Sequence, residues 1–176
     1  MSPGEQFTIL NIAVLTLSDS RTPETDTSGD ALVEMLQQAG HQLGDRALCP
    51  DDVYRMRAIV AQWIADPDID VVITTGGTGF TGRDSTPEAL GPLFDRPIDT
   101  FGELFRQLSY AEIGSSTVQS RCLAGLANQT LIFCVPGSTG ACRTAWNGIL
   151  RDQLDSRHRP CNFVAVTRKG SGVQPH

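Results

Sequence analysis

The sequence predicts a single α/β domain with a mostly parallel sheet, and three observations support this prediction. The chain has 176 residues, which is the length of one domain. Hydrophobic residues make up 40% of the chain and charged residues 19%, so the chain can bury a core. Short apolar runs alternate with amphipathic stretches of helical period, which is typical of strands that alternate with helices.

The first predicted β–α unit begins with an apolar run at residues 9–17, which ends at Ser18-Asp19. The length of this run and its polar end indicate a buried strand. A helix follows, with Thr27 or Ser28 as its cap and Gly40 as its end.

The second predicted unit has a short strand near residues 42–49 and then Pro50-Asp51-Asp52, which provides a turn and a helix cap. The apolar residues of the next helix recur with a 3.6-residue period. They are Val53, Met56, Ile59, Val60, Trp63 and Ile64. Asp66-Pro67-Asp68 ends this helix, and residues 70–75 form the clearest buried strand of the sequence.

This strand leads directly into Gly76-Gly77-Thr78-Gly79, and Thr86 is the expected cap of a helix with Pro87 in its first position. The apolar residues of that short helix are Ala89, Leu90, Leu93 and Phe94. Residues 101–112 are also predicted to be helical.

Two short apolar runs, at residues 122–126 and 130–135, surround Asn128-Gln129 and predict a hairpin. Pro136-Gly137-Ser138 then opens a long helix. Its apolar positions are Ala141, Ala145, Ile149, Leu150 and Leu154. We therefore expect one domain at residues 1–155, followed by a partly ordered C-terminal tail at residues 156–176.

Composition and charge exclude several classes of protein. The net charge is −6, whereas nucleic-acid and membrane-surface proteins usually carry a basic patch. Lys169 is the only lysine of the chain, so no lysine lies beside the glycines, as a Walker-type phosphate loop requires. The three histidines (His41, His158 and His176) do not have metal-ligand spacing.

The five cysteines contain no C-x-x-C pair, which favours buried free thiols in a reducing compartment. The first eight residues contain no lysine or arginine, unlike the start of a signal peptide. No apolar run approaches the ~20 residues that span a bilayer. We therefore expect a soluble, cytoplasmic protein.

In parallel sheets, ligands bind beyond the carboxyl ends of the strands. Three segments are expected to leave strands at that edge, namely residues 17–19, 74–84 and 135–138, and residues 49–51 are a candidate fourth. The sequence predicts the functional site where these loops meet.

The segment at residues 74–88 is the most informative one, because small residues after a buried strand let backbone N–H groups turn toward an anion. It contains Gly77-x-Gly79-x-x-Gly82, which matches the dinucleotide fingerprint. The expected helix starts too late for that fingerprint, so a nicotinamide site is disfavoured. A tight glycine turn without a ligand stays an alternative.

Asp51 and Asp84 each lie close to the start of a predicted helix. Two roles remain open for them at this point. They could simply favour helix initiation through the helix dipole. They could also converge at the strand ends to hold Mg²⁺ against a triphosphate. For Asp19, a cap or turn role is favoured.

Two further features have alternatives of their own. Pro136-Gly137-Ser138, placed before a helix, can present free N–H groups to a phosphate. Arg106 could pair either with an anion or with Glu103, three residues earlier.

Taken together, these segments resemble the molybdopterin-binding MogA/MoaB family of molybdenum-cofactor biosynthesis. The resemblance covers roughly residues 7–155, and the pieces occur in family order. They are Ser18-Asp19, Thr27-Ser28-Gly29, Pro50-Asp51, Thr74 to Gly79, Arg83-Asp84-x-Thr86-Pro87-Glu88, Phe101-Gly102-Glu103 and Pro136-Gly137-Ser138. Residues 143–146 and 159–163 are more similar to the MoaB branch than to the MogA branch.

The resemblance implies a three-layer α/β/α fold and a homotrimer, or in the MoaB branch a hexamer built from trimers. It also implies an adenylyltransferase that transfers AMP from ATP to molybdopterin with Mg²⁺. The terminal phosphate of the pterin attacks the α-phosphorus and pyrophosphate leaves. A molybdenum-insertion enzyme would use the product.

The resemblance places the catalytic acids of the family on Asp51 and Asp84, which are also the expected Mg²⁺ ligands. Some MoaB-branch members lack these acids and are thought inactive, whereas this chain has both. The other residues expected to bind substrate or nucleotide are Ser18, Asp19, Thr75, Gly76, Gly77, Thr78, Gly79, Arg83, Thr86, Glu103, Arg106, Pro136, Gly137 and Ser138.

Two other functions remain open. The chain could bind molybdopterin without catalysis, as a scaffold whose acids only cap helices. It could also be a general nucleotide-binding protein, which the glycine loop alone would support. Under every reading we expect small-molecule ligands, and neither nucleic acid nor a membrane as partner.

Overall fold

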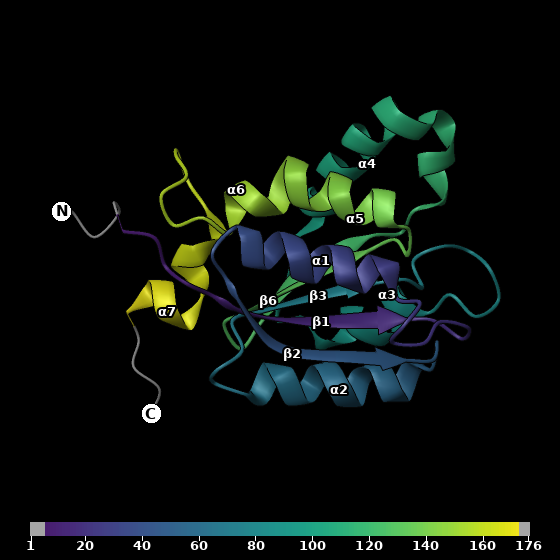
Figure 1. Cartoon of the computed structure of the whole chain (residues 1–176), viewed down its shortest axis with the longest axis horizontal. Coiled ribbons are helices and arrows are strands. Elements are labelled where there is room, and N and C mark those ends of the chain that lie inside the picture. Colours follow the sequence, from purple (N-terminus) through teal and green to yellow (C-terminus); the bar gives the residue numbers. More distant parts are fainter. Residues whose placement is uncertain (1–5, 173–176) are drawn as a thin grey trace.

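The computed structural model describes residues 6–172, and its helices lie in two layers that enclose a central sheet (Figure 1). Residues 1–5, at the start of the predicted domain, and residues 173–176, at the end of the predicted tail, lie outside the described residues. The strands are β1 (Asn11–Leu17), β2 (Gln42–Cys49), β3 (Val71–Thr75), β4 (Arg96–Pro97), β5 (Leu123–Ala127) and β6 (Thr130–Val135).

The α-helices are α1 (Thr27–Gln38), α2 (Val53–Ala65), α3 (Thr86–Leu90), α4 (Asp99–Ile113), α5 (Thr139–Ala145), α6 (Arg151–Gln153) and α7 (Arg168–Ser171). The 3₁₀ segments are η1 (Gly91–Leu93), η2 (Gly114–Gln119) and η4 (Phe163–Val166), and η3 (Trp146–Leu150) is a π-helical turn. The predicted three-layer α/β/α fold with a mostly parallel sheet is confirmed.

The sheet has the strand order β2-β1-β3-β6-β5-β4. The first four of these strands are parallel, and β5 is antiparallel to both of its neighbours, β6 and β4. The chain leaves β1 toward β2 on one side and later returns to β3 on the other side. Such a reversal of strand order opens a crevice at the carboxyl ends of the strands.

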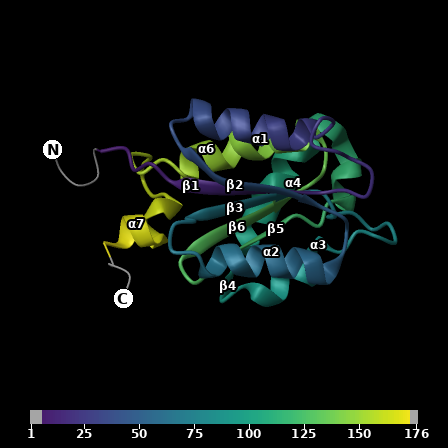
Figure 2. The ribbon, with the colours of Figure 1, turned by 60° about the horizontal axis from the view of Figure 1, so that its bottom comes forward.

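Alternate residues of β1 face opposite layers, as the two-residue period of a strand requires. Ile12 and Val14 belong to the core beneath α1, α4 and α5, whereas Ala13, Leu15 and Leu17 belong to the core beneath α2 and α3. Figure 2 shows α1 and α2 on opposite sides of the sheet. Burial on both faces explains why β1 reads as one continuous apolar run.

The cap of α1 is Asp26, so the prediction of Thr27 or Ser28 is wrong. The Asp26 carboxylate accepts the backbone N–H of Gly29 at 3.0 Å, and it also accepts the hydroxyl of Thr16 at 2.8 Å. The bond to Thr16 ties the start of α1 to β1. Sequence spacing could not show this tertiary contact.

Helix α2 begins where the sequence predicted, with Asp52 as its cap. Its side chain accepts the backbone N–H groups of Tyr54 at 3.0 Å and Arg55 at 2.9 Å. Asp51 is therefore not the cap of this helix, and the alternative in which Asp51 serves only that purpose is wrong.

The predicted hairpin joins β5 to β6. Its two turn residues, Asn128 and Gln129, both have positive φ values, of 49° and 62°. Positive φ at both central residues is the geometry of the two-residue turn that matches the twist of the flanking strands. The side-chain amide of Asn128 also donates to the carbonyl of Ile64 at 2.9 Å and ties the turn to α2.

The predicted helix after Ser138 is confirmed, although its interior contains the π-helical turn η3. The predicted helix through Leu93 and Phe94 is too long, because α3 ends at Leu90 and Phe94 is extended. The short elements β4 and η2 carry no periodic pattern, and the sequence did not predict them.

Residues 156–172 of the predicted tail pack against the domain. Val164 is 2% exposed, and the ring of Phe163 packs edge-on against Phe133 of β6. The ammonium of Lys169 forms an ion pair with Asp70 at 2.9 Å. This part of the chain belongs to the fold more closely than its polar composition suggested, because a few apolar residues supply the contacts.

All five cysteines are free thiols. Cys49, Cys122, Cys134 and Cys142 are buried, as predicted, and Cys161 is exposed. Burial raises the pKa of Cys134 to about 12, so this thiol stays protonated. Within residues 6–172, no helix combines the length and hydrophobicity needed to cross a membrane.

Candidate functional site

A cavity of about 570 Å³ lies at the carboxyl edge of the sheet, beyond β1, β3 and β6. It receives the four segments that the sequence placed together. The predicted site residues that line it are Ser18, Asp19, Asp51, Thr75, Gly76, Gly77, Thr78, Gly79, Arg83, Asp84, Pro136, Gly137 and Ser138. The predicted convergence of these loops is thus confirmed.

The glycine loop after β3 needs its glycines because its backbone has positive φ values and passes close to other segments of the chain. Gly76 has φ +107°, and a Cβ at this position would lie 3.2 Å from the backbone carbon of Leu17. Gly77 has φ +70°. Any side chain at these two positions would be strained, so the close passage of the loop over the end of β1 requires glycine.

Thr86 supports the glycine loop from below and does not line the cavity. Its hydroxyl donates to the carbonyl of Gly76 at 2.8 Å, and its backbone N–H donates to the carbonyl of Gly77 at 3.0 Å. Thr86 was predicted as the cap of α3, but the residue before the helix is Ser85, which makes no side-chain cap bond.

The dinucleotide fingerprint is not realised. Helix α3 begins at Thr86, four residues beyond Gly82, whereas the fingerprint requires the helix to open within the glycine pattern. A Cβ on Gly82 would also enter open space among the described residues. The third glycine therefore performs no helix–strand packing here.

Asp51 points toward the glycine loop from the end of β2. A Cβ built on Gly77 would lie 2.7 Å from its Oδ1 atom. Within residues 6–172, this buried oxygen has no hydrogen-bond partner. Burial first, and then the charges of Asp19 and Asp84, raise the pKa of Asp51. A buried, unpaired carboxylate oxygen among other acids is suited to receive a cation or a ligand donor.

Asp84 approaches the same loop from its far end. Its Oδ2 atom accepts the backbone N–H of Thr81 at 3.0 Å and the hydroxyl of Thr81 at 2.6 Å. A Cβ on Gly79 would lie 2.7 Å from this oxygen. The carboxylate thus closes a turn inside the loop, and it makes no cap bond to α3.

Asp19 and Arg83 form an ion pair across the entrance of the cavity. The guanidinium donates to both carboxylate oxygens, at 2.8 and 2.9 Å. This pairing lowers the pKa of Asp19. Asp19 was favoured as a cap or turn residue, and instead it joins Arg83 to the backbone of Asp51.

Pro136, Gly137 and Ser138 form the third side of the cavity. Ser138 caps α5 by accepting the backbone N–H of Ala141 at 3.1 Å. The hydroxyl of Thr75 donates to the carbonyl of Pro136 at 2.9 Å. The bond from Thr75 connects the end of β3 to the segment after β6, so the two loops form one continuous surface.

The structure does not bring Glu103 and Arg106 into this cavity. Arg106 donates to the carbonyl of Ser120 at 3.4 Å, and a second, smaller depression contains both Glu103 and Arg106. Arg106 thus braces the chain segment behind the cavity wall. The alternative in which Arg106 pairs with Glu103 is not realised either, since this pair is not among the ion pairs of the described residues.

One wall of the cavity was not predicted from the sequence. This wall comes from α4, η2 and the start of α5, and it has no motif of its own. Its residues are Phe105, Ser109, Ile113, Ser116, Thr117, Gln119, Ser120 and Ala141. Phe105, Ile113 and Ala141 make part of this wall apolar. Thr117 and Ser120 add two buried hydroxyl oxygens that have no hydrogen-bond partner within residues 6–172.

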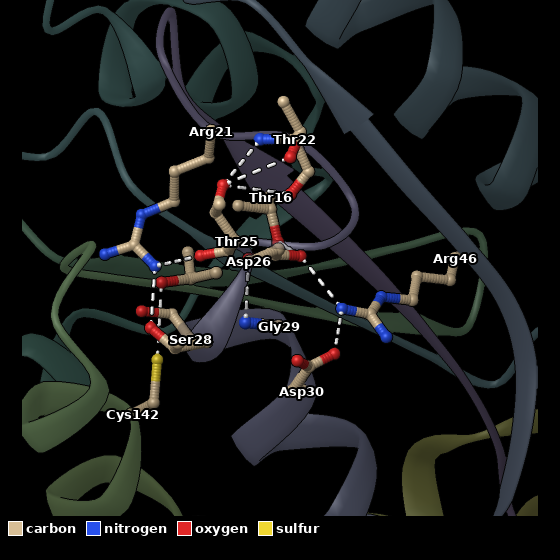
Figure 3. Close-up of polar contacts among 12 residues, drawn as sticks. Thr16, Arg21, Thr22, Thr25, Asp26, Ser28, Gly29, Asp30, Arg46 and Cys142 are labelled. Carbon is tan, nitrogen blue, oxygen red and sulfur yellow. Dashed lines mark hydrogen bonds and ion pairs between the residues drawn. The ribbon is translucent and has the colours of Figure 1, made fainter.

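Arg21 is a further cavity residue that the sequence analysis missed. Its guanidinium donates to the carbonyl of Thr25 at 3.2 Å (Figure 3). It also donates to the hydroxyl of Thr27 at 2.8 Å. These bonds fold the side chain back along the loop that precedes α1. Arg21 therefore adds a second fixed cation to the cavity, besides Arg83.

The loop that carries Arg21 is anchored by the buried carboxylate of Asp26 (Figure 3). Arg46 of β2 donates to Asp26 at 3.0 Å and to Asp30 at 2.7 Å. Asp26 therefore joins α1, β1 and β2 on the face of the sheet behind the cavity. This network is structural, because its charges are already paired.

The carboxylate oxygens in the cavity are suitable ligands for a small, hard cation. Mg²⁺ is usually held by one or two carboxylates together with substrate phosphates. Asp51 and Asp84 offer two such carboxylates, one of them with an unpaired buried oxygen. Residues 6–172 contain no group of three or more His, Cys, Asp or Glu side chains that could hold a metal ion by themselves. The other ligands of a cation would therefore have to come from substrate and water.

Comparison with known proteins agrees with this geometry. Residues 13–156 match the family described as "Probable molybdopterin binding domain". Molybdenum cofactor biosynthesis protein B of Escherichia coli (strain K12) is 56% identical over 164 residues, which are 93% of this chain and 96% of that protein.

Solved structures give the same result. A crystal structure of molybdenum cofactor biosynthesis protein B matches with a TM-score of 0.81 at 42% identity, over 84% of this chain and 92% of that chain. The tungsten cofactor synthesizing protein MoaB from Pyrococcus furiosus matches with a TM-score of 0.74 at 34% identity, over 82% of this chain and 92% of that chain.

Proposed function

The chain belongs to the molybdopterin-binding MoaB/MogA family of molybdenum cofactor biosynthesis proteins, and we propose that it is a molybdopterin adenylyltransferase. In this reaction the terminal phosphate of molybdopterin attacks the α-phosphorus of ATP. A new phosphorus–oxygen bond forms, the bond to the β-phosphate breaks, and pyrophosphate leaves. The products are adenylyl-molybdopterin and pyrophosphate.

One observation carries this proposal: Asp51 and Asp84 approach a single glycine loop from two directions. Each has a carboxylate oxygen 2.7 Å from where a Cβ of that loop would stand, at Gly77 and at Gly79. Two acids that merely started their own helices would not converge in this way. Within residues 6–172, one buried oxygen of Asp51 also has no hydrogen-bond partner, so it is free to bind a cation or a ligand.

Phosphoryl-type transfer asks a protein mainly to position its substrates and to neutralise charge. A phosphate nucleophile is already ionised at neutral pH, so Asp51 and Asp84 need not act as bases. We assign both acids to holding Mg²⁺. When bound, Mg²⁺ would offset the negative charge that phosphate groups bring next to these acids.

The other residues of the cavity suit the remaining tasks. The backbone N–H groups of Gly77 and Ser138 can donate to phosphate oxygens, since both residues line the cavity at the ends of strands. The N–H of Gly76 instead donates to the carbonyl of Val135 at 3.0 Å and fixes the start of the loop. Arg21 and Arg83 supply positive charge at its edge. The wall formed by α4 and η2 combines Phe105 with unpaired hydroxyls, which suits a heterocycle with several donors and acceptors.

The test is an assay of the full-length protein with ATP, Mg²⁺ and molybdopterin that measures pyrophosphate release. The Asp51→Ala, Asp84→Ala double variant serves as the comparison. Release by the wild type alone would support transfer at these acids. Pterin binding without release would favour the non-catalytic binder, and tight ATP binding without pterin affinity would favour a general nucleotide-binding protein.

We also propose that the chain forms a homo-oligomer, a trimer or a hexamer, and that a molybdenum-insertion enzyme consumes its product. Exposed apolar side chains on α4 and η2 support assembly. They are Leu104, Tyr110, Ile113 and Val118. Light scattering tests this proposal, because the measured mass should be three or six times the 19.0 kDa of one chain.

A further inference from the structure

Arg121 holds the glycine loop from the segment that directly follows the cavity residue Ser120. It follows η2 and precedes β5, so it lies far from the loop in the sequence. Its backbone N–H donates to the carbonyl of Thr78 at 2.8 Å. Its side chain donates to the carbonyl of Gly79 at 2.9 Å through Nε and to the carbonyl of Asp84 at 3.2 Å through Nη2.

Two more contacts fix the guanidinium itself. Its Nη1 atom pairs with the carboxylate of Glu88 in α3. Its carbon also lies 4.9 Å from the centre of the exposed Phe80 ring, within the range of a cation–π contact. Because the Arg121 side chain is only 25% exposed, these bonds are partly shielded from water.

The two carbonyls that the side chain binds lie on either side of the turn at Thr81. The bonds inside this turn, between Thr81 and Asp84, set its shape but do not fix its place in the molecule. The ion pair of Arg83 with Asp19 gives the turn one external contact, on its exposed side. Arg121 supplies the other anchor, and it holds the chain both before and after the turn.

We infer that Arg121 is a positioning residue for Asp84. It fixes where the Asp84 carboxylate stands relative to Asp51, and it joins the glycine loop to the wall that contains Thr117 and Ser120. A ligand held against that wall would therefore meet a loop already in place. The catalytic consequence rests on the proposed function, whereas the ordering of the loop does not.

The shape of the side chain matters as well as its charge. A guanidinium has five N–H donors in a planar fork and can reach two carbonyls and a carboxylate together. A lysine ammonium concentrates its donors at one point. Arg121→Lys should therefore keep the charge and lose the simultaneous hold on Gly79 and Asp84.

The first test is amide hydrogen exchange of the full-length protein without ligands. Arg121→Met and Arg121→Lys should both speed exchange in residues 78–84 by about tenfold, since the loop then opens locally. Glu88→Gln should leave exchange near the wild-type rate, because it spares both carbonyl bonds. Arg151→Met controls for the loss of an exposed arginine in α6.

Unchanged exchange in both Arg121 variants would overturn the inference, and so would wild-type protection in Arg121→Lys. Thermal unfolding of each variant shows whether the domain still folds. If Arg121→Met does not fold, the exchange measured for Arg121→Lys still decides the test.

The second test is the AMP-transfer assay. A displaced Asp84 should lower kcat by about 10- to 100-fold, with a much smaller change in KM for ATP. A lower kcat in Arg121→Lys, with Glu88→Gln nearly unaffected, supports the positioning role. A change confined to KM would contradict it. If the wild type itself transfers no AMP, the proposed function fails, and hydrogen exchange still decides whether Arg121 orders the loop.

Discussion

The backbone N–H of Asp51 donates to the carboxylate of Asp19 at 3.1 Å, so one acid fixes the chain that carries another. The hydrogen bonds from Arg83 lower the pKa of Asp19, so this acceptor stays ionised. The arrangement keeps negative charge next to Asp51 and contributes to the raised pKa of that residue. Evolved proteins commonly accept such local repulsion where a ligand relieves it.

Asp51→Asn should make the ligand-free protein more stable at pH 7.5 and abolish AMP transfer. A carboxyl with a raised folded pKa contributes stability that is fully present below its unfolded pKa and is lost as the pH rises through the folded pKa. Removing the charge should raise Tm by about 2–4 °C, the shift that ~1 kcal/mol produces in a domain of this size.

The gain should shrink as the pH falls toward ~4, the ordinary pKa of an aspartate, because wild-type Asp51 then takes up a proton. Thermal unfolding across this pH range measures the effect, with the exposed Asp68→Asn as control. A variant that is less stable than the wild type at pH 7.5 would show that Asp51 has a stabilising partner.

Two glycines of the same loop should respond in opposite ways. Gly77→Ala forces a side chain into φ +70° and against Asp51 and Thr86, so it should cost ~2 kcal/mol or more and impair activity. Gly82→Ala places its methyl group in open space and should be nearly neutral. Urea unfolding of both variants makes the comparison, and equal losses would refute this account of the loop.

Features of the fold that depend on neighbouring residues in the sequence were predicted, whereas features that depend on contacts between distant segments were missed. Strand β6 was predicted with its correct ends, because it is buried along its whole length and reads as an apolar run. Strand β2 was also predicted at its correct residues, although most of it is exposed or half-buried, because Gly40 and Pro50 bound it. The cap at Asp26 was missed, since its position depends on contacts with Thr16 and Arg46 in neighbouring strands. The short elements β4 and η2 have no period to detect.

The same distinction holds for the candidate site. Loops that leave parallel strands must meet at one edge, so their acids and glycines were predictable. Arg21 and Arg121 were not, because their roles come from bonds to carbonyls, which any sequence provides. Glu103 belongs to a segment that resembles the family, and Arg106 was a candidate anion partner, but both lie in a separate depression beside α4.

Lys169→Met should loosen the C-terminal segment from the sheet. Lys169 pairs with Asp70, whose side chain is 1% exposed, and also donates to the carbonyl of Ile9 at 2.9 Å. Removing the ammonium leaves a buried carboxylate that keeps only the backbone N–H of Asn11 as donor. The cost should be about 2 kcal/mol, below the ~3–5 kcal/mol of fully buried pairs, because the lysine is partly exposed.

Chemical denaturation measures this loss, and limited proteolysis should cut the variant faster after residue 156. The Lys169→Met, Asp70→Asn double variant should recover part of the stability, because it no longer buries an unpaired charge. If Lys169→Met alone unfolds at the wild-type denaturant concentration, the ion pair does not hold the segment.

His41 should make the protein less stable in mild acid. Its ring is 5% exposed, and its Nδ1 atom accepts the backbone N–H of Leu10 at 3.2 Å, which only an unprotonated nitrogen can do. Burial lowers the pKa of His41, and Lys169 adds to this effect, whereas Asp155 and Asp70 oppose it. The folded protein therefore takes up this proton less readily than the unfolded chain.

A base whose folded pKa is depressed stabilises the fold above its unfolded pKa, ~6.5 for histidine, and this contribution is lost as the pH falls toward the folded pKa. The free energy of unfolding should drop by ~1 kcal/mol between pH 7.5 and 5.5, with a slope of at most ~1.4 kcal/mol per pH unit for one proton. His41→Phe should lose ~1–3 kcal/mol at pH 7.5, because the Leu10 N–H then has no acceptor, and this variant should show little slope. His158→Gln, which changes the half-buried ring of the other described histidine, should keep the wild-type slope. Denaturant titrations at several pH values separate the two histidines, and a slope that survives in His41→Phe would assign the proton to another group.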